Sequence, residues 1–460
     1  MQAIRDYASA HRDRFVKELV EFLRFPSVST DPAHAKDLVA CCDWVVRHLK
    51  GLGLDVQVDK SGQHAHVLAR SRNFDRTDLP HLLIYGHYDV QPPDPLNEWK
   101  SPPFEPTIRG KDVFARGASD NKGQIFAHMK GVEAMLKAGG GLPVRVTLLV
   151  EGEEEIGSPS LAAMIRARKS ELASDAILIS DCDQLAPGRP AILYGLRGLA
   201  AAELRLKGPS RDVHSGTYGG SIRNPIHELC SIVAGLHDAD GRVNVPGFYN
   251  DVRPVQDWER ENAKTLAFDE KAFLHEAGVD ALHGEKGFTT LERRGARPTV
   301  EINGIYGGYQ GAGSKTVLPA AAGCKITCRL VPDQDPGRIL DLLEARIREL
   351  TPRGVRATFE RGGGAKAMFV PKEGPLMEVA VRAVREGFGA EPVFMRMGGS
   401  IPVTSYFEDI LEQASILIGF ALPDDGHHSP NEKFHLPELE RGILTSCAFM
   451  KELAAAESRV

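Results

Sequence analysis

Short apolar runs alternate with amphipathic segments over the first 180 residues of the chain. Apolar runs of four to eight residues bounded by polar turns predict strands, whereas apolar residues recurring every three to four positions predict helices. Strands that alternate with helices indicate a largely parallel sheet covered on both faces. The expected helices span 3–24, 35–51, 123–137 and 158–168, and the expected strands span 54–59, 64–70, 82–85, 143–150 and 176–180.

The pattern changes after Gly195 and returns near residue 371. A chain of 460 residues exceeds the size at which one hydrophobic core keeps growing, so two domains are expected. We predict an α/β host domain in two parts, 1–198 and 371–460, interrupted by an α+β domain at 199–370. Within the insertion and after it, we expect helices at 224–237, 257–276, 335–350 and 374–388, and strands at 298–303, 324–331, 354–360 and 414–420.

Charge and composition restrict the classes of partner that the protein is expected to bind. A net charge of -6 gives no basic field for nucleic acid or an anionic membrane, so we expect a small-molecule or peptide partner. Charged residues interrupt the N-terminal segment, and no later run approaches 18 apolar residues, so we expect a cytoplasmic protein that is not membrane-bound. Seven cysteines without a CxxC pair indicate reduced thiols.

Candidate ligands for a metal follow four apolar strands. His87 and Asp89 follow the strand at 82–85, four acids at 151–155 follow the next, and Asp181 and the loop with His428 follow two others. The carboxyl ends of parallel strands meet at one edge of a sheet, so these side chains are expected to lie together. Imidazoles and carboxylates gathered in this way predict a metal site.

Each candidate also has an ordinary interpretation. His87 resembles a surface histidine at a strand edge, and Asp120, in the turn of ARGASDNKGQ, resembles a helix N-cap. The glutamates at 153–155 resemble a solvated acidic run. Only their joint position after the strands favours a shared site.

Five motifs together resemble one enzyme family. YGHYDVQPP, ASDNKGQ, EGEEEIGS, ISDCD and GHHSPNE occur in this order, with the inserted domain between the last two. The chain is similar, nearly end to end, to the co-catalytic metallopeptidases of the group that includes carnosinase and the cytosolic non-specific dipeptidases. Aminoacylase, acetylornithine deacetylase, succinyl-diaminopimelate desuccinylase and carboxypeptidase G are related. The resemblance implies hydrolysis of the amide bond of dipeptides or short peptides by an α/β di-metal hydrolase domain with an inserted lid and dimerisation domain.

The resemblance also implies the roles of individual residues. Two divalent ions are expected per chain, with zinc as the expected metal and manganese or cobalt as alternatives. Asp89 would orient His87, Glu154 would be the general base, and His427 is left out of the ligand set. A cis peptide between Asp120 and Asn121 is implied as well. The expected metal ligands are His87, Asp120 and Asp181 for one ion, and Asp120, Glu155 and His428 for the other, so that Asp120 bridges.

In the inserted domain, GPSRDVHSGTYGG resembles a loop whose histidine, here His214, stabilises the oxyanion in the active site of a partner subunit. This implies a homodimer formed through the insertion. The similarity of two further segments implies that Thr316, Arg329, Gly399 and Ser400 contact the substrate, with Arg329 binding a carboxylate in a bidentate manner.

Two other functions are compatible with parts of the pattern. An N-acyl amino acid amidohydrolase would use the same metals on a different acyl group. A scaffold without catalytic activity would lack a ligand or the equivalent of Glu154, and every one of these positions is filled.

Overall fold

The computed structural model describes residues 1–457 and divides into two compact units. The first unit comprises Met1–Tyr194, Val370–Met395 and the residues from 402 on. The second comprises Gly195–Phe369 and Arg396–Ile401. It covers nearly the same residues as the insertion expected at 199–370. The short segment 396–401 joins it from beyond that range.

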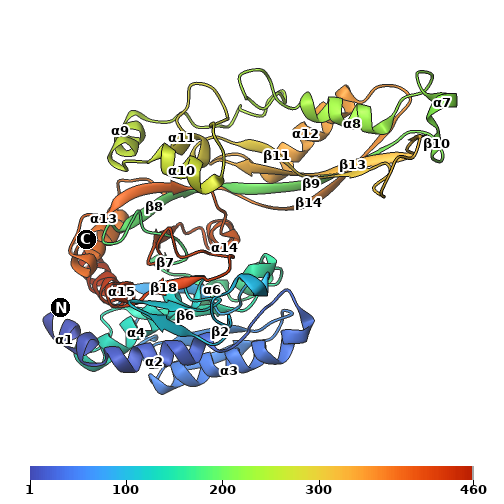
Figure 1. Ribbon diagram of the computed structural model, residues 1–460. Coiled ribbons are helices and arrows are strands. Elements are labelled where there is room, and N and C mark those ends of the chain that lie inside the picture. The colour runs from blue at the N-terminus through green and yellow to red at the C-terminus, as the bar shows by residue number, and fades with distance from the viewer. Residues whose placement is uncertain (458–460) are drawn as a thin grey trace. The chain divides into compact units, whose positions relative to one another are not determined.

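The first unit is built from helices and strands that alternate along the chain (Figure 1). Its elements are α1 (Gln2–Ala10), α2 (Arg12–Leu23), α3 (Ala35–Gly51), β1 (Asp55–Asp59), β2 (His66–Arg70), β3 (His81–His87), β4 (Thr107–Arg109), β5 (Asp112–Phe114), α4 (Lys122–Ala138), β6 (Arg145–Glu151), α5 (Leu161–Ala167), α6 (Lys169–Leu172), β7 (Ala176–Ile179), β8 (Ala191–Leu196, which runs into the second unit), α13 (Pro375–Phe388), β16 (Val393–Met397, likewise), α14 (Pro402–Tyr406), the π-helical turn η4 (Phe407–Leu411), β17 (Ser415–Ile418), β18 (Lys433–His435) and α15 (Leu436–Glu457).

The central sheet of this unit has the order β1-β2-β6-β3-β7-β17-β8. The four central strands β6, β3, β7 and β17 are parallel, while β1, β2 and β8 pair antiparallel at the edges. Every residue of β3 is buried, which explains its unbroken apolar run. Gly86 faces Ile125 of α4, and Tyr85 on the opposite face packs edge-on against Phe407 of η4. The predicted fold class, with a mostly parallel sheet covered on both faces, is confirmed.

The second unit has an α+β organisation. Its elements are β9 (Gly198–Lys207), β10 (Val213–His214), α7 (Ser215–Tyr218), α8 (Pro225–Ala234), α9 (Asp257–Thr265), α10 (Glu270–Ala277), α11 (Thr290–Gly295), β11 (Thr299–Gly307), β12 (Val317–Leu318), β13 (Ala321–Leu330), α12 (Pro336–Leu350), β14 (Arg356–Ala365) and β15 (Met368–Phe369).

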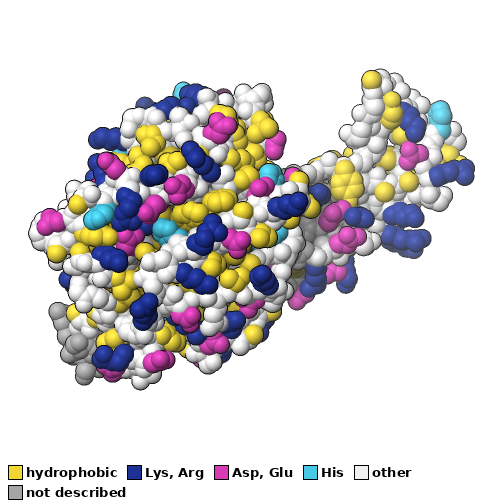
Figure 2. All heavy atoms as spheres, turned by 90° about the horizontal axis from the view of Figure 1, so that it is seen from below, with side chains coloured by type: hydrophobic (Ala, Val, Ile, Leu, Met, Phe, Trp, Pro, Cys, Tyr) yellow, Lys and Arg dark blue, Asp and Glu magenta, His cyan; other side chains and the backbone are white. Residues whose placement is uncertain are grey.

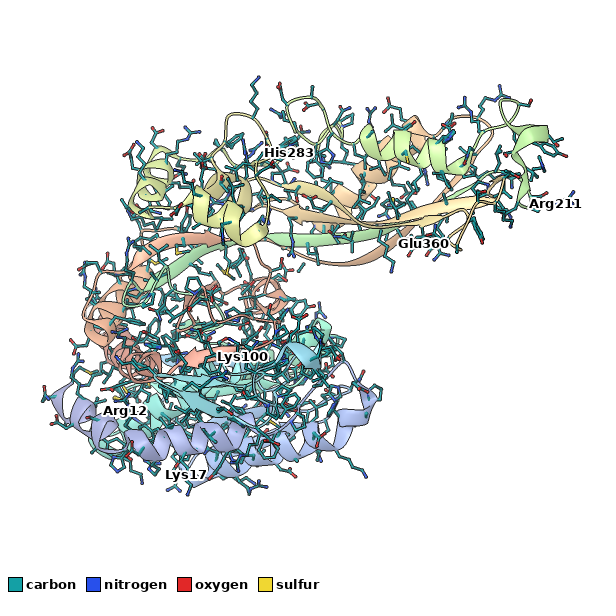
Figure 3. The ribbon with its side chains drawn as sticks, viewed as in Figure 1. Arg12, Lys17, Lys100, Arg211, His283 and Glu360 are labelled. Carbon is teal, nitrogen blue, oxygen red and sulfur yellow. The ribbon has the colours of Figure 1, made fainter. Side chains whose placement is uncertain are left out.

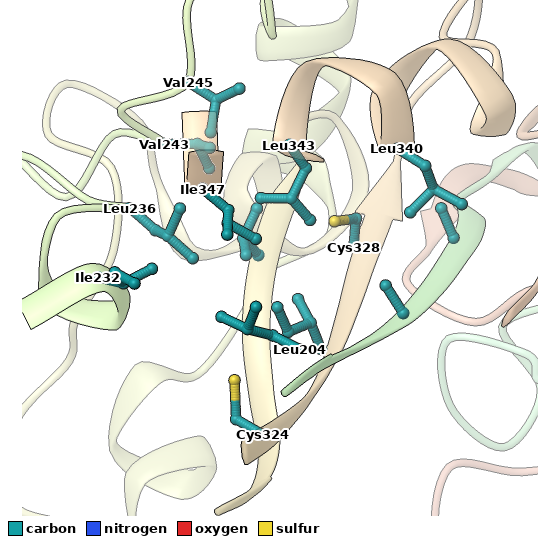
Figure 4. Packing of buried hydrophobic residues seen from close by; sticks show 14 of the residues in the cluster. Leu204, Ile232, Leu236, Val243, Val245, Cys324, Cys328, Leu340, Leu343 and Ile347 are labelled. Carbon is teal, nitrogen blue, oxygen red and sulfur yellow. The ribbon is translucent and has the colours of Figure 1, made fainter. Parts of the chain in front are cut away.

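A four-stranded antiparallel sheet of order β11-β13-β9-β14 forms the core of this unit. Along β13 the residues alternate, so that Cys324, Ile326 and Cys328 are buried while Thr327 and Arg329 lie on the other face. The buried face packs against α8 and α12, as the cluster in Figure 4 shows with Ile232, Leu340 and Leu343. The opposite face is therefore free to carry polar side chains.

Two long predicted helices are each divided in the structure. The helix expected at 3–24 breaks at His11, whose ring nitrogen hydrogen-bonds the carbonyl of Tyr7 at 2.9 Å. The helix expected at 257–276 ends at Thr265, and a second one begins after Asp269, which caps it by accepting from the N–H groups of two residues. The prediction of continuous helices was wrong because it ignored these local hydrogen bonds.

Basic and acidic side chains are interspersed over the face of the molecule that Figure 2 presents, consistent with the modest net charge. Within residues 1–457, none of the helices is long and apolar enough to cross a membrane.

Candidate metal centre

The strand β3 delivers His87 to its carboxyl end, where the side chain is fully buried. Its Nδ1 lies 3.0 Å from the backbone carbonyl of Asp89 and 3.4 Å from the Asp89 Oδ1. The Asp89 carboxylate is fixed in turn by the Ser29 hydroxyl at 2.7 Å and by the backbone N–H groups of Glu154 and Glu155. With Nδ1–H donated to Asp89, Nε2 of His87 is left as a ligand atom.

The turn that carries Asp120 is held by Glu432, a fully buried residue of the C-terminal part. The Glu432 carboxylate accepts hydrogen bonds from the backbone N–H groups of Gly117, Ser119 and Asp120 at 2.9–3.0 Å. Its charge is balanced by Arg116, whose Nη1 donates to it at 2.7 Å. The peptide between Asp120 and Asn121 is cis, as the resemblance implies.

The five expected ligands form two triads that share one residue. His87, Asp120 and Asp181 place one ligand atom each within 4.8 Å of one another, and so do Asp120, Glu155 and His428. The His87 Nε2 lies 3.2 Å from the Asp120 Oδ1, and the His428 Nε2 lies 2.9 Å from the Asp120 Oδ2. The two oxygens of Asp120 therefore face different imidazoles, which is the geometry required of a bridging carboxylate.

The charges of this cluster perturb one another strongly. Burial alone would lower the pKa of His87, but the nearby carboxylates of Asp120 and Asp181 raise it well above its usual value. Burial would raise the pKa of Asp120, but the imidazoles of His428 and His87 beside its two oxygens lower it. The pKa of Glu155 is raised by burial and by the nearby Asp120 charge. A cation bound between such crowded carboxylates would offset their mutual repulsion.

Two buried polar atoms of the cluster favour its interpretation as a metal site. The His87 Nε2 and the Glu155 Oε1 are buried, and neither has a hydrogen-bond partner among residues 1–457. Buried polar atoms are nearly always satisfied, and a divalent ion bound to these lone pairs would satisfy both. Two histidines and three carboxylates suit zinc, and also manganese or cobalt. The donor set therefore fits two divalent ions.

Two adjacent glutamates after β6 have different surroundings. The Glu153 carboxylate is fully buried and accepts hydrogen bonds from the His64 N–H at 2.8 Å and from the Ser160 hydroxyl at 2.6 Å. The Glu154 carboxylate, on the short 3₁₀ turn η3 (Glu154–Ile156), forms no hydrogen bond or ion pair with any residue that the structure describes. Burial and the charges of Asp181 and Asp120 raise the pKa of Glu154 well above its usual value. Glu154 thus carries a carboxylate beside the two triads that has no partner within the described part of the chain.

His427, which the sequence analysis left out, belongs to neither triad. Its Nε2 lies 2.7 Å from the Asp183 Oδ1, and its Nδ1 lies 4.0 Å from the Asp120 Oδ2. Burial opposes its protonation, but the hydrogen bond to Asp183 raises the pKa of His427 to about 10. His427 therefore adds positive charge beside the cluster.

In the second unit, β10 pairs with β12 and places His214 opposite Val317, next to Thr316. The His214 side chain is exposed, and its Nδ1 accepts a hydrogen bond from the Gly216 N–H at 3.0 Å. In the neutral ring the proton is then on Nε2, which is available as a donor.

Ser400 meets Arg329 in the same unit. The Arg329 Nη1 donates to the Ser400 Oγ at 3.0 Å, and this hydroxyl donates to the backbone carbonyl of Arg197 at 2.5 Å. Gly399 precedes Ser400 in the segment 396–401. Two segments 71 residues apart are thus joined at the Arg329 guanidinium.

Several residues that position the candidate ligands were not found from the sequence. Ser29 holds Asp89, Gln91 donates to Glu155 at 2.7 Å, and Asn121 donates to the Asp181 Oδ1 at 2.9 Å. Glu432 lies within the quoted motif GHHSPNE, but no feature of the sequence separates a buried acid there from an exposed one.

Comparison with known proteins shows one consistent set of relatives. The model of peptidase family M20/M25/M40 matches residues 83–452. The Cys-Gly metallodipeptidase dug1 of Schizosaccharomyces pombe is 30% identical over 467 residues, which cover 96% of each chain. Human carnosine dipeptidase 1 superposes with a TM-score of 0.82 at 28% identity, covering 99% of this chain and 98% of that one. The metallo-carboxypeptidase Sso-CP2 of Sulfolobus solfataricus gives a TM-score of 0.85 at 31% identity, covering 96% and 99%.

Proposed function

This chain belongs to peptidase family M20/M25/M40, and from that premise we propose that it hydrolyses dipeptides and short peptides with Glu154 as the general base. It is a metal-dependent hydrolase, and its relatives include metallodipeptidases. The observation that carries the proposal is the pair of triads sharing Asp120, with the unpaired Glu154 carboxylate beside them.

The five ligands would hold two divalent ions, His87, Asp120 and Asp181 around one and Asp120, Glu155 and His428 around the other. Such ions supply a water of lowered pKa and polarise the scissile carbonyl. Zinc is the metal that we propose for this set.

Glu154 removes the proton from the attacking water at its carboxylate and returns it to the leaving amine. A carboxyl group with a raised pKa suits this task, because it must both accept and release a proton near neutral pH. Asp89 acts through His87, whose ring it holds with Nε2 facing the ligand cluster.

Substrate recognition is assigned to the second unit. Arg329 binds the C-terminal carboxylate of the substrate, and Ser400 fixes the guanidinium that does so. Thr316 and Gly399 contact the peptide. The His214 Nε2–H stabilises the oxyanion in the site of a partner subunit, so we propose a homodimer, acting in the cytoplasm.

A substrate panel tests this function. The metal-loaded protein should hydrolyse dipeptides such as Ala-Ala and Cys-Gly faster than N-acetyl and N-succinyl amino acids, in the presence of zinc and of manganese separately. Faster turnover of the acylated amino acids would replace the dipeptidase with a deacylase. Turnover of neither class would reject both.

A further inference from the structure

A strongly basic cavity lies within the second unit. Its volume is about 570 Å³, within the range of pockets that bind small molecules. Five arginines and two histidines, among them His283 in Figure 3, line it against two glutamates. The floor includes the polar face of the sheet, with Thr299 of β11 paired to Arg329 of β13.

Two of the five arginines bind to Glu285, which is itself part of the cavity wall. Arg297 forms a bidentate ion pair with the buried Glu285, with distances of 2.7 and 2.8 Å. Arg293 donates its Nε–H to the backbone carbonyl of Glu285 at 2.9 Å. These contacts hold the wall together and leave little capacity for a ligand.

The other three arginines have no acidic partner in the part of the chain that the structure describes. Arg197, Arg294 and Arg329 form no ion pair with a carboxylate among residues 1–457, although Glu301 lines the same cavity. The half-buried Arg197 donates its Nε–H to the backbone carbonyl of Gly398 at 3.2 Å. Its remaining N–H groups have no acceptor among the described residues.

These guanidinium groups are close enough to affect one another. Burial and the charges of Arg329 and Arg294 lower the pKa of Arg197 to about 10. Ser400 bridges the Arg329 guanidinium to the Arg197 backbone, and the Arg294 guanidinium carbon is held 5.0 Å from the centre of the Phe273 ring. Like charges gathered in a cavity and fixed by neutral contacts are the arrangement of a preformed anion site.

We propose that Arg197 and Arg294 form a second anion subsite beside Arg329, which makes the protein selective for dipeptides with an acidic C-terminal residue. This inference rests on the proposed function, in which Arg329 binds the α-carboxylate. The side-chain carboxylate of a C-terminal glutamate then binds Arg197 and Arg294 in the same cavity. A neutral C-terminal residue leaves these two charges unpaired.

The test compares Ala-Glu with Ala-Gln, which differ only in the charge of the second side chain. The wild-type protein should show a kcat/KM for Ala-Glu about 10- to 100-fold above that for Ala-Gln, the range expected from a charge-assisted pair. Arg197→Met should remove most of this preference while kcat/KM for Ala-Gln stays within about threefold, and Arg294→Met should act in the same direction. Arg356→Met removes an exposed arginine of the same unit outside the cavity and should change neither value.

Equal values for the two peptides in the wild-type protein, or an equal loss for both in Arg197→Met, would overturn the proposal. If no dipeptide is hydrolysed, the proposed function fails and so does the substrate preference. Calorimetry with free glutamate and glutamine then decides on the anion subsite itself. Tighter binding of glutamate that Arg197→Met abolishes supports the subsite, and equal binding of the two amino acids refutes it.

Discussion

The backbone N–H of Asp120 donates to the Glu432 Oε1 at 3.0 Å, across 312 residues of sequence. A carboxylate far along the chain therefore sets the position of the residue shared by both triads. Buried next to it, Arg116 supplies the compensating charge.

Glu432→Gln should destabilise the protein, because an amide keeps the volume but loses the charge that Arg116 needs. Removing one partner of a buried ion pair costs about 3–5 kcal/mol in the free energy of unfolding. Urea denaturation of the wild type and the variant measures the difference. Glu105→Gln, at an exposed acid, is the control, and equal losses in both variants would contradict the assigned role.

Metal stoichiometry should depend on which ligand is changed. Wild-type protein purified without chelator should hold two equivalents, Asp181→Asn about one, and Asp120→Asn close to none, because only Asp120 belongs to both triads. Elemental analysis after dialysis measures this. Asp183→Asn, outside both triads, should keep two equivalents; one equivalent in a fully loaded wild type would rule out the two-ion site.

Glu154→Gln should keep both metals and lower kcat by about 10²- to 10⁴-fold, the usual contribution of general-base catalysis. The amide preserves the shape of the side chain but cannot accept the proton from water. Steady-state kinetics together with metal content measure the effect. A metal-loaded variant with near-normal kcat would move the role to another group, although Glu153 is already engaged by His64 and Ser160.

His214→Ala should lower kcat by about 10²- to 10³-fold, as expected for loss of one oxyanion donor, without loss of metal. Subunit exchange then tests whether His214 acts on the partner's site. Heterodimers of His214→Ala and Glu154→Gln chains contain one intact site if His214 acts in trans, so activity should rise towards half of wild type. Verified heterodimers with no recovery would reject the trans arrangement.

Because His128 is buried, we expect the stability of the protein to depend on pH in a specific way. Its ring is fully buried between the hydroxyls of Ser446 and Ser180, and burial lowers the pKa of His128 to about 3. The native state thus favours the neutral ring, and this contribution is complete above the unfolded pKa of about 6.5 and is lost as the pH falls below it.

Relative to metal-free His128→Gln, metal-free wild type should therefore lose about 2 kcal/mol of unfolding free energy between pH 7 and pH 5. Urea denaturation at the two pH values measures this difference. His227→Gln, at an exposed histidine, is the control, and the difference in unfolding free energy between wild type and this variant should not change between the two pH values. The same difference between wild type and His128→Gln at both pH values would contradict the buried neutral state.

The clustering of the candidate ligands was accessible to sequence reasoning because of the sheet order. β6, β3 and β7 are parallel neighbours, so residues at or just after their carboxyl ends, such as His87, Glu155 and Asp181, must lie at one edge. The direction of β1 and β2 was not accessible, because an apolar pattern identifies a strand but not the direction of its partner.

The C-terminal helix α15 is not among the helices expected from the sequence. Residues 443–450 are all buried, so the segment has no apolar stripe of helical period to recognise. The role of Glu432 was missed for a related reason, since burial of an acid depends on Arg116 and on a turn more than 300 residues away.

The segment 396–401 means that the polypeptide passes from one unit to the other four times, at residues 194–195, 369–370, 395–396 and 401–402. The second unit is consequently discontinuous in sequence. A fragment spanning 195–369 would lack Ser400, so the Arg329 guanidinium would lose its hydroxyl acceptor and the Arg197 carbonyl its donor. Any attempt to exchange the second unit between relatives must therefore transplant two pieces of chain, the long insertion and this six-residue return.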